Sequence, residues 1–198
     1  MIYLPKAFER YISSLRLYVQ MSVLRGGSNV KRLSQLKKIG LAEAFYLKEE
    51  RSALDIIKLS NSVLGATMII LLQRGVKISV ILSGNGVYLL NRKLYTALLT
   101  ELADGFEAGE NKIFIRIKGS RLTIKADGCR RSGLLCRLIR LLGGIYFIEN
   151  AGKKLIISIP LKKTQMEPEA VENEWCYILD RFSPVNIWLL RVTGDDFH

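Results

Sequence analysis

The residues best suited to bind an anion lie between a predicted strand and a predicted helix. The strand, RLTIKAD (121–127), alternates apolar and polar residues and leads into Gly128. A basic turn, Cys129-Arg130-Arg131-Ser132, then enters an amphipathic helix over 132–142 that Gly143-Gly144 would end. Arginines at the start of a helix can hold a phosphate or a carboxylate. The alternative is a tight basic turn that holds no ligand.

The remaining reactive side chains form no recognisable catalytic set. The cysteines, Cys129, Cys136 and Cys176, have neither metal-site spacing nor an even disulfide framework, so we expect reduced thiols. The single histidine is His198. The longest apolar run, around 63–72, is too short to span a bilayer, and the first residues lack a secretory pattern. These features predict a cytoplasmic protein without a metal site or a membrane span.

Charge is distributed unevenly along the 198 residues, whose net charge is +12. Residues 1–163 carry 28 Lys/Arg against 11 Asp/Glu, and residues 164–198 carry two against seven. A basic body would attract nucleic acid, a membrane surface or an acidic protein, or its own acidic tail. A solvated basic surface without a partner is the remaining alternative. Hydrophobic residues make up 49% of the chain, enough for a packed core.

The elements needed to position these residues follow from apolar spacing and turn residues. Helical spacing predicts helices over 4–25 and 29–47, joined at Gly26-Gly27 as a hairpin that could dimerise. The later elements are helix 54–74, strands 76–82 and 87–90, helix 92–107 capped by Asn91, strands 112–119 and 121–127, helix 132–142, and strands 145–150 and 154–161. In the tail we expect a helix from Pro168 to about Phe182 and a strand over 185–192. The fold class is therefore α+β: an N-terminal helical hairpin, then a two-layer α/β sandwich.

This order of elements resembles the ATP-binding domain of sensor histidine kinases, the GHKL ATPase fold. Residues 94–117 resemble the Asn-box helix and its following strand, and 121–128 the strand that ends in the Asp-x-Gly box. Residues 133–161 resemble the last helix, its Gly-Gly stop and the closing hairpin. The resemblance, which covers about residues 1–163, implies a dimerisation hairpin over 1–50 and an ATPase-like sandwich without its ATP lid over 51–163. From its composition we expect residues 164–198 to be an acidic extension that packs on the sandwich.

The resemblance fails at the residues that would transfer a phosphoryl group or bind Mg²⁺. A histidine kinase uses a histidine of its first helix, and Phe8-Glu9 stands there instead. The two asparagines of the Asn box, which in the family touch Mg²⁺ and the phosphates, are matched by Thr100 and Asp104. Asp104 could still bind Mg²⁺ through its carboxylate, or it could be a rim residue. We expect Glu101 to be a surface or rim carboxylate.

The adenine-binding position is also altered. If Leu122, Ile124 and Ala126 point inward, Gly128 matches the glycine of Asp-x-Gly, and Ala126 stands where the family has its aspartate. Asp127 then faces the other side of the sheet. The second glycine-rich box falls on residues 129–132, so no lid remains between strand and helix.

These departures predict a non-catalytic, histidine-kinase-like protein that acts as a dimeric interaction or regulatory module in bacterial signalling. A response regulator or a sensor kinase is the partner that the resemblance implies, and no cofactor is expected, although ATP with Mg²⁺ is conceivable. The first alternative is residual nucleotide or anion binding at a vestigial site. The residues of that site would be Thr100, Asp104, Asp127, Gly128, Arg130 and Arg131.

The second alternative is nucleic-acid binding through a basic face. The candidate cations are Lys112, Arg116, Lys118, Arg121, Lys125, Arg130, Arg131, Arg137 and Arg140. Because no helix-turn-helix, RNA-recognition or OB signature accompanies them, nucleic acid is not the expected partner. We also consider that the acidic tail docks across the surface left by the missing lid, or elsewhere on the sheet.

Overall fold

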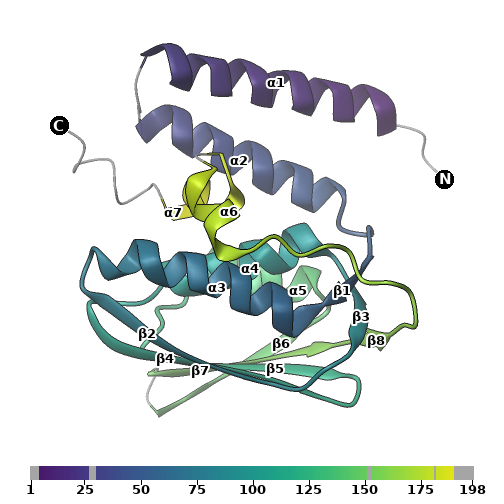
Figure 1. The fold of residues 1–198 in the computed structure, drawn as a ribbon, viewed down its shortest axis with the longest axis vertical. Helices are drawn as coiled ribbons and strands as arrows, with labels where there is room; N and C mark the ends of the chain where they lie inside the picture. Colours follow the sequence, from purple (N-terminus) through teal and green to yellow (C-terminus); the bar gives the residue numbers. More distant parts are fainter. Residues whose placement is uncertain (1–4, 27–29, 151–152, 181, 190–198) are drawn as a thin grey trace.

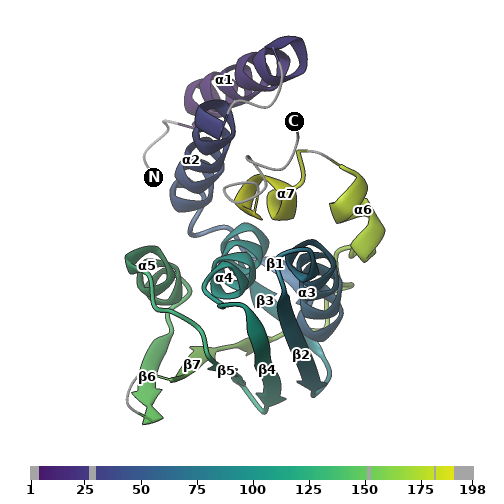
Figure 2. The same ribbon diagram turned by 90° about the vertical axis from the view of Figure 1, so that its left-hand side faces the viewer.

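The computed structural model describes residues 5–26, 30–150, 153–180 and 182–189. Figures 1 and 2 show a helical hairpin above a layer of helices, which in turn lies on one face of a sheet. The elements are α1 (Pro5–Gly26), α2 (Val30–Tyr46), β1 (Ser52–Asp55), α3 (Ile56–Leu72), β2 (Val76–Ser83), β3 (Val87–Leu90), α4 (Arg92–Asp104), β4 (Gly109–Lys118), β5 (Arg121–Asp127), α5 (Gly133–Leu141), β6 (Ile145–Glu149), β7 (Lys154–Pro160), β8 (Lys162–Lys163), α6 (Glu174–Leu179) and α7 (Pro184–Leu189).

The main sheet has five strands in the order β2-β4-β5-β7-β6. The β2–β4 pair is parallel and the other pairs are antiparallel. A smaller antiparallel sheet, β1-β3-β8, lies beside it. The predicted order of strands and helices over residues 76–161 is confirmed, and so is the two-layer α+β class.

The core lies between the main sheet and the helices α3, α4 and α5. Alternate residues of each strand face these helices, as the two-residue period of a strand requires. Leu98 and Leu102 of α4 and Ile124 of β5 have no exposed surface. The hydroxyl groups of Tyr95 and Ser60 lie 2.7 Å apart in this core and join α4 to α3. The opposite face of the sheet is not covered by any helix of the described chain (Figure 2).

The hairpin and the sandwich are in contact. Ile12 and Val19 of α1 pack with Leu36 and Ile39 of α2 in a separate apolar cluster. Helix α2 also touches α4 and α7. The backbone of Phe8 and Glu9, the expected match to the phosphoacceptor position, lies in α1, but their side chains lie outside the described part of the structure. No helix in the described ranges is long and apolar enough to cross a membrane.

The bounds of α3, α4 and β4 differ from those expected, and β4 begins at Gly109 rather than at 112. The predicted helix 54–74 begins only at Ile56, because Ser52–Asp55 pairs with β3 and the Asp55 carboxylate then caps α3 by accepting from the Lys58 amide at 3.0 Å. Helix α4 ends at Asp104 rather than 107, because Phe106 forms a β-bridge with Cys129.

The tail departs further from its prediction. The expected strand 185–192 was wrong, because Pro184–Leu189 is a helix whose Ser183 hydroxyl accepts from the Asn186 amide. The expected helix from Pro168 shortens to Glu174–Leu179, since the preceding segment bonds to the body through the Glu169 amide and the Ala53 carbonyl at 2.8 Å. Helices α6 and α7 contact α3 and α4. Within the described residues the tail therefore packs on the helical layer of the sandwich.

Candidate functional site

The directions of the side chains at the end of β5 determine which groups a ligand of the sandwich could contact. Leu122, Ile124 and Ala126 are fully buried and Asp127 is exposed, as the alternating pattern predicts. The methyl group of Ala126, the residue that we expected at the adenine-binding position, therefore lies within the core. The Asp127 carboxylate is exposed and faces away from the helices, as the strand alternation requires.

The basic turn between β5 and α5 packs directly against the end of α4. The Arg130 amide donates to the Gly105 carbonyl at 2.7 Å, and the Cys129 thiol donates to the Leu102 carbonyl at 3.2 Å. A Cβ atom on Gly105 would lie 2.7 Å from the Arg130 carbonyl oxygen, so only glycine allows this approach. We call this contact between residues 128–132 and 102–106 the seam.

A buried carboxylate links the seam to the rest of the molecule. Glu101 of α4 is 8% exposed, which corrects its expected rim position. It accepts from the Ser132 hydroxyl at 2.7 Å, the Trp188 indole at 2.9 Å and the Lys37 ammonium at 3.3 Å. The Lys37 ammonium also lies 4.9 Å from the centre of the Trp188 ring. Four elements, α2, α4, α7 and the start of α5, therefore meet at one carboxylate.

The surroundings explain the ionisation of two groups at the seam. Burial acts to raise the pKa of Glu101, but the Ser132 hydrogen bond, the Lys37 charge and the Trp188 hydrogen bond outweigh it and hold that pKa below 4.5. Burial, together with the nearby Glu101 charge, raises the pKa of Cys129 to about 12. The carboxylate is thus ionised and fully used in hydrogen bonds, and the thiol stays protonated. Neither group is available as a nucleophile or base.

The six residues of the expected vestigial site do not come together. Thr100 is fully buried, and its hydroxyl donates to the carbonyls of Thr96 and Ala97 in its own helix. Asp104 is the last residue of α4 and is partly exposed. Neither lines the hollow that contains the other four residues, which are Asp127, Gly128, Arg130 and Arg131.

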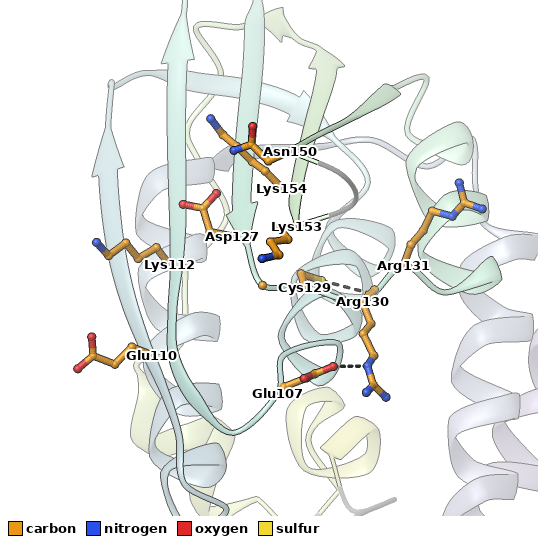
Figure 3. A pocket seen from close by; sticks show the side chains of 11 residues that line it. Glu107, Glu110, Lys112, Asp127, Cys129, Arg130, Arg131, Asn150, Lys153 and Lys154 are labelled. Carbon is orange, nitrogen blue, oxygen red and sulfur yellow. Dashed lines mark hydrogen bonds and ion pairs between the residues drawn. The ribbon is translucent and has the colours of Figure 1, made fainter.

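That hollow lies at the end of β5 and has a volume of about 830 Å³ (Figure 3). Its floor contains Gly128, which has a φ of 86°. Arg130 forms an ion pair with Glu107 across the hollow. Lys112, Lys153 and Lys154 add positive charge from the neighbouring strands and loop. In the described residues no group of three or more His, Cys, Asp or Glu is arranged to hold a metal ion.

Sequence reasoning missed Glu101 and its partners for an identifiable reason. Lys37, Ser132 and Trp188 are far from Glu101 in the sequence, so no local spacing marks the cluster. Ser132 alone carried a signal, because it stands at the start of the predicted helix, where its hydroxyl accepts from the Leu135 amide at 2.9 Å.

No protein-family model matches this sequence, and no curated protein does. Solved structures do. Full-length ShkA in complex with AMPPNP aligns with a TM-score of 0.56 at 13% identity, over 81% of this chain and 46% of that one. The cytoplasmic segment of histidine kinase QseC aligns with a TM-score of 0.50 at 11% identity, over 69% and 96%. The Acinetobacter baumannii histidine kinase AdeS gives 0.48 at 16% identity, over 79% and 97%.

The likenesses to ShkA and QseC show the class of fold. The chain has a histidine-kinase-like GHKL fold, preceded by a helical hairpin, and the resemblance predicted from the sequence is confirmed at that level. The relatives share too few residues with this chain to transfer their chemistry.

Proposed function

We propose that this chain is a non-catalytic, histidine-kinase-like protein that acts as a dimeric protein-interaction or regulatory module in bacterial signalling. The observation that carries the proposal is the seam. Residues 128–132 contact the end of α4 in the place where a kinase has its lid, with the Arg130 amide 2.7 Å from the Gly105 carbonyl. A nucleotide between α4 and α5 would have to displace this contact and the Ser132–Glu101 hydrogen bond.

The residues needed to bind adenine and to accept a phosphoryl group are missing as well. Ala126 replaces the adenine-binding carboxylate, and the only histidine of the chain is His198 rather than a residue of the hairpin. A phenyl group at Phe8 has no nitrogen to accept a phosphoryl group.

Isothermal titration calorimetry with ATP and with ADP, each with Mg²⁺, tests the proposal. We expect no heat of binding at ligand concentrations up to about 1 mM, a range that would detect the usual affinities of small substrates. A catalytically competent histidine kinase domain, titrated in the same buffer, serves as the positive control. Micromolar binding of either nucleotide, or transfer of labelled phosphate to the chain, would overturn the non-catalytic assignment.

The outer surface of α1 supports the dimeric part of the proposal. Tyr11, Leu17, Tyr18 and Met21 are between 41% and 72% exposed and recur at helical spacing. A second hairpin covering them would complete a four-helix bundle. Light scattering coupled to size-exclusion chromatography should give a dimer mass. Tyr18→Glu should give the monomer, while Lys58→Glu on the exposed side of α3 should not. A monomeric wild-type protein would exclude this arrangement.

The hollow at Asp127 supports a second candidate, residual anion binding. Lys112, Lys153 and Arg131 line it together with the Arg130–Glu107 pair. A ligand that binds only the folded state raises the melting temperature. If this second candidate holds, a thermal-shift screen with phosphate and pyrophosphate will show stabilisation that Lys153→Ala abolishes. No shift with any of these anions would remove this candidate.

A further inference from the structure

The uncovered face of the main sheet carries an apolar row that crosses all five strands. Strand register places five outward side chains side by side, and we call them the central row: Ile81, Phe114, Lys125, Ile156 and Phe147. Ile81 and Phe147, at the two edges, are each 55% exposed. Four of these five residues are apolar on a surface that no described helix covers.

Cations without partners border this row on the β4–β5 hairpin. Arg116, Lys118 and Arg121 project from the same face, and Lys125 lies within the row itself. None of these four forms an ion pair with any described residue. Lys118 and Arg121 are directly opposite each other, an arrangement of like charges that destabilises a sheet. An anionic ligand would offset that repulsion.

A hollow of about 690 Å³ joins the apolar and cationic features. Phe114, Arg116, Lys118, Arg121 and Lys125 line it, and its described lining includes no carboxylate. The hollow at Asp127, by contrast, contains Glu107, Glu110 and Asp127 among its cations. The hollow at the β4–β5 hairpin therefore has the larger excess of positive charge of the two hollows.

The fold separates the candidate cations of the predicted basic face into two sets. Arg130 is paired with Glu107, Arg131 lies 5.9 Å from the centre of the Tyr146 ring, and Arg137 lies 4.3 Å from that of Phe45. These arginines are engaged with neighbouring side chains. The cations on the uncovered face are not, so the charge available to a partner is concentrated beside the central row.

We propose that the uncovered face, from the β4–β5 hairpin across the central row, binds single-stranded nucleic acid. Rows of outward side chains lie roughly 7 Å apart along a strand, so along β4 the Phe114 ring, which could stack on a base, lies between Lys112 and Arg116, which could bind phosphates. A duplex keeps its bases stacked and away from the rings. A second copy of the chain would bring two faces of like charge together. This inference goes beyond the proposed function and does not depend on it.

Fluorescence anisotropy with labelled twelve-residue oligothymidylate and oligouridylate tests the proposal on the full chain. We expect dissociation constants below about 100 μM at low salt. If four phosphates are contacted, the logarithm of the association constant should fall against the logarithm of salt concentration with a slope of about −2.8. Absence of binding, or binding insensitive to salt, would overturn the proposal.

A charge-matched pair of variants locates the site. The triple variant Arg116→Ala, Arg121→Ala, Lys125→Ala should weaken binding at least about tenfold and flatten the salt slope by about 2. The control Lys38→Ala, Lys58→Ala, Arg140→Ala removes the same charge from exposed positions on the helical side and should change affinity less than about twofold. Equal losses in the two variants would show attraction by net charge alone and would refute the site.

Two further measurements test the role of the rings. Phe114→Leu and Phe147→Leu keep an apolar side chain but remove the aromatic face, and each should weaken binding about fivefold or more. Phe147 is on an edge strand, so its variant should fold even if the Phe114 variant does not. A duplex of the same length should bind more weakly, and polyglutamate should not compete at equal charge concentration. Equal binding of duplex, or full competition by polyglutamate, would overturn recognition of a single strand in favour of a general polyanion or acidic-protein surface.

Discussion

The Trp188 indole N–H donates to the Glu101 carboxylate over 2.9 Å, which joins α7 to the middle of α4. Lys37 of α2 donates to the same oxygen at 3.3 Å, and Ser132 donates to the other oxygen. Segments separated by most of the chain thus depend on one buried anion. Removing a donor from a buried charged group costs more than removing a solvent-exposed contact.

Trp188→Phe should destabilise the protein by about 1–3 kcal/mol, because Glu101 stays buried and loses its indole donor while ring volume is largely kept. Trp175→Phe is the matched control, since Trp175 is 55% exposed and should change stability by less than about 0.5 kcal/mol. Urea unfolding followed by circular dichroism measures both. Similar midpoints for the two variants would contradict a role for the Trp188–Glu101 bond.

Acid should weaken the contribution of Glu101. Its folded-state pKa lies below 4.5, so the unfolded chain takes up the proton first as pH falls. The stabilisation is therefore complete well above pH 4.5 and is lost as pH falls through the folded-state pKa. The difference in unfolding free energy between wild type and Glu101→Gln should be constant near neutral pH and shrink below about pH 4.5.

Urea titrations at a series of pH values measure that difference. Glu107→Gln is the control, because the Glu107–Arg130 pair is largely exposed and such pairs contribute little at any pH. A difference for Glu101→Gln that grows on acidification would contradict the direction of the pKa shift.

Alanine substitutions at two glycines, one at each end of the turn between β5 and α5, should change the stability of the protein in opposite directions. Gly128 has a φ of 86°, and a Cβ atom there would lie 2.6 Å from the Asn111 side-chain oxygen, so Gly128→Ala should cost about 1–3 kcal/mol. Gly133 begins α5 with nothing within 4 Å of a Cβ atom, so Gly133→Ala should stabilise by about 0.5–1 kcal/mol. Thermal unfolding distinguishes the two; a stabilised Gly128→Ala protein would show that the turn has another conformation.

The three thiols should react with iodoacetamide in order of exposure. Cys176 is exposed, Cys136 is intermediate and Cys129 is buried at the seam with a pKa of about 12. At about pH 8 we expect Cys176 to be alkylated first and Cys129 only in denaturant, as peptide mass spectrometry will show. Alkylation of Cys129 as fast as that of Cys176 in the native protein would mean that the seam opens readily.

Local patterns predicted the parts of the sandwich that local interactions form. The alternation in 121–127 predicted both the bounds of β5 and its buried face, and Asn91 was recognised as the cap of α4, where its side chain accepts from the Leu94 amide at 2.8 Å. Gly143, with a φ of 71°, ends α5 as expected. In each case the residue that gives the sequence pattern also makes the local structure that the pattern predicts.

Elements that depend on distant partners were missed. Ser52–Asp55 is too short to read as a strand, and its hydrogen bonds come from β3. The β-branched residues of 185–192 favoured a strand, although Ser183-Pro184 is a recognisable helix start. The candidate site was only partly predictable for the same reason: the altered residues are visible in sequence, but the closure of the seam and the assembly of the uncovered face require strand register and packing.

The Trp188–Glu101 bond also has a consequence for biosynthesis. Trp188 follows every other member of the Glu101 cluster in the chain. During synthesis, α4 therefore leaves the ribosome before the Trp188 indole that donates to Glu101 has been made. A nascent chain arrested before Pro184 would contain the hairpin, the sheet and α4, but its central carboxylate would have one donor fewer. We expect such intermediates to resist protease less than chains that include α7, because this short helix supplies the indole donor to Glu101.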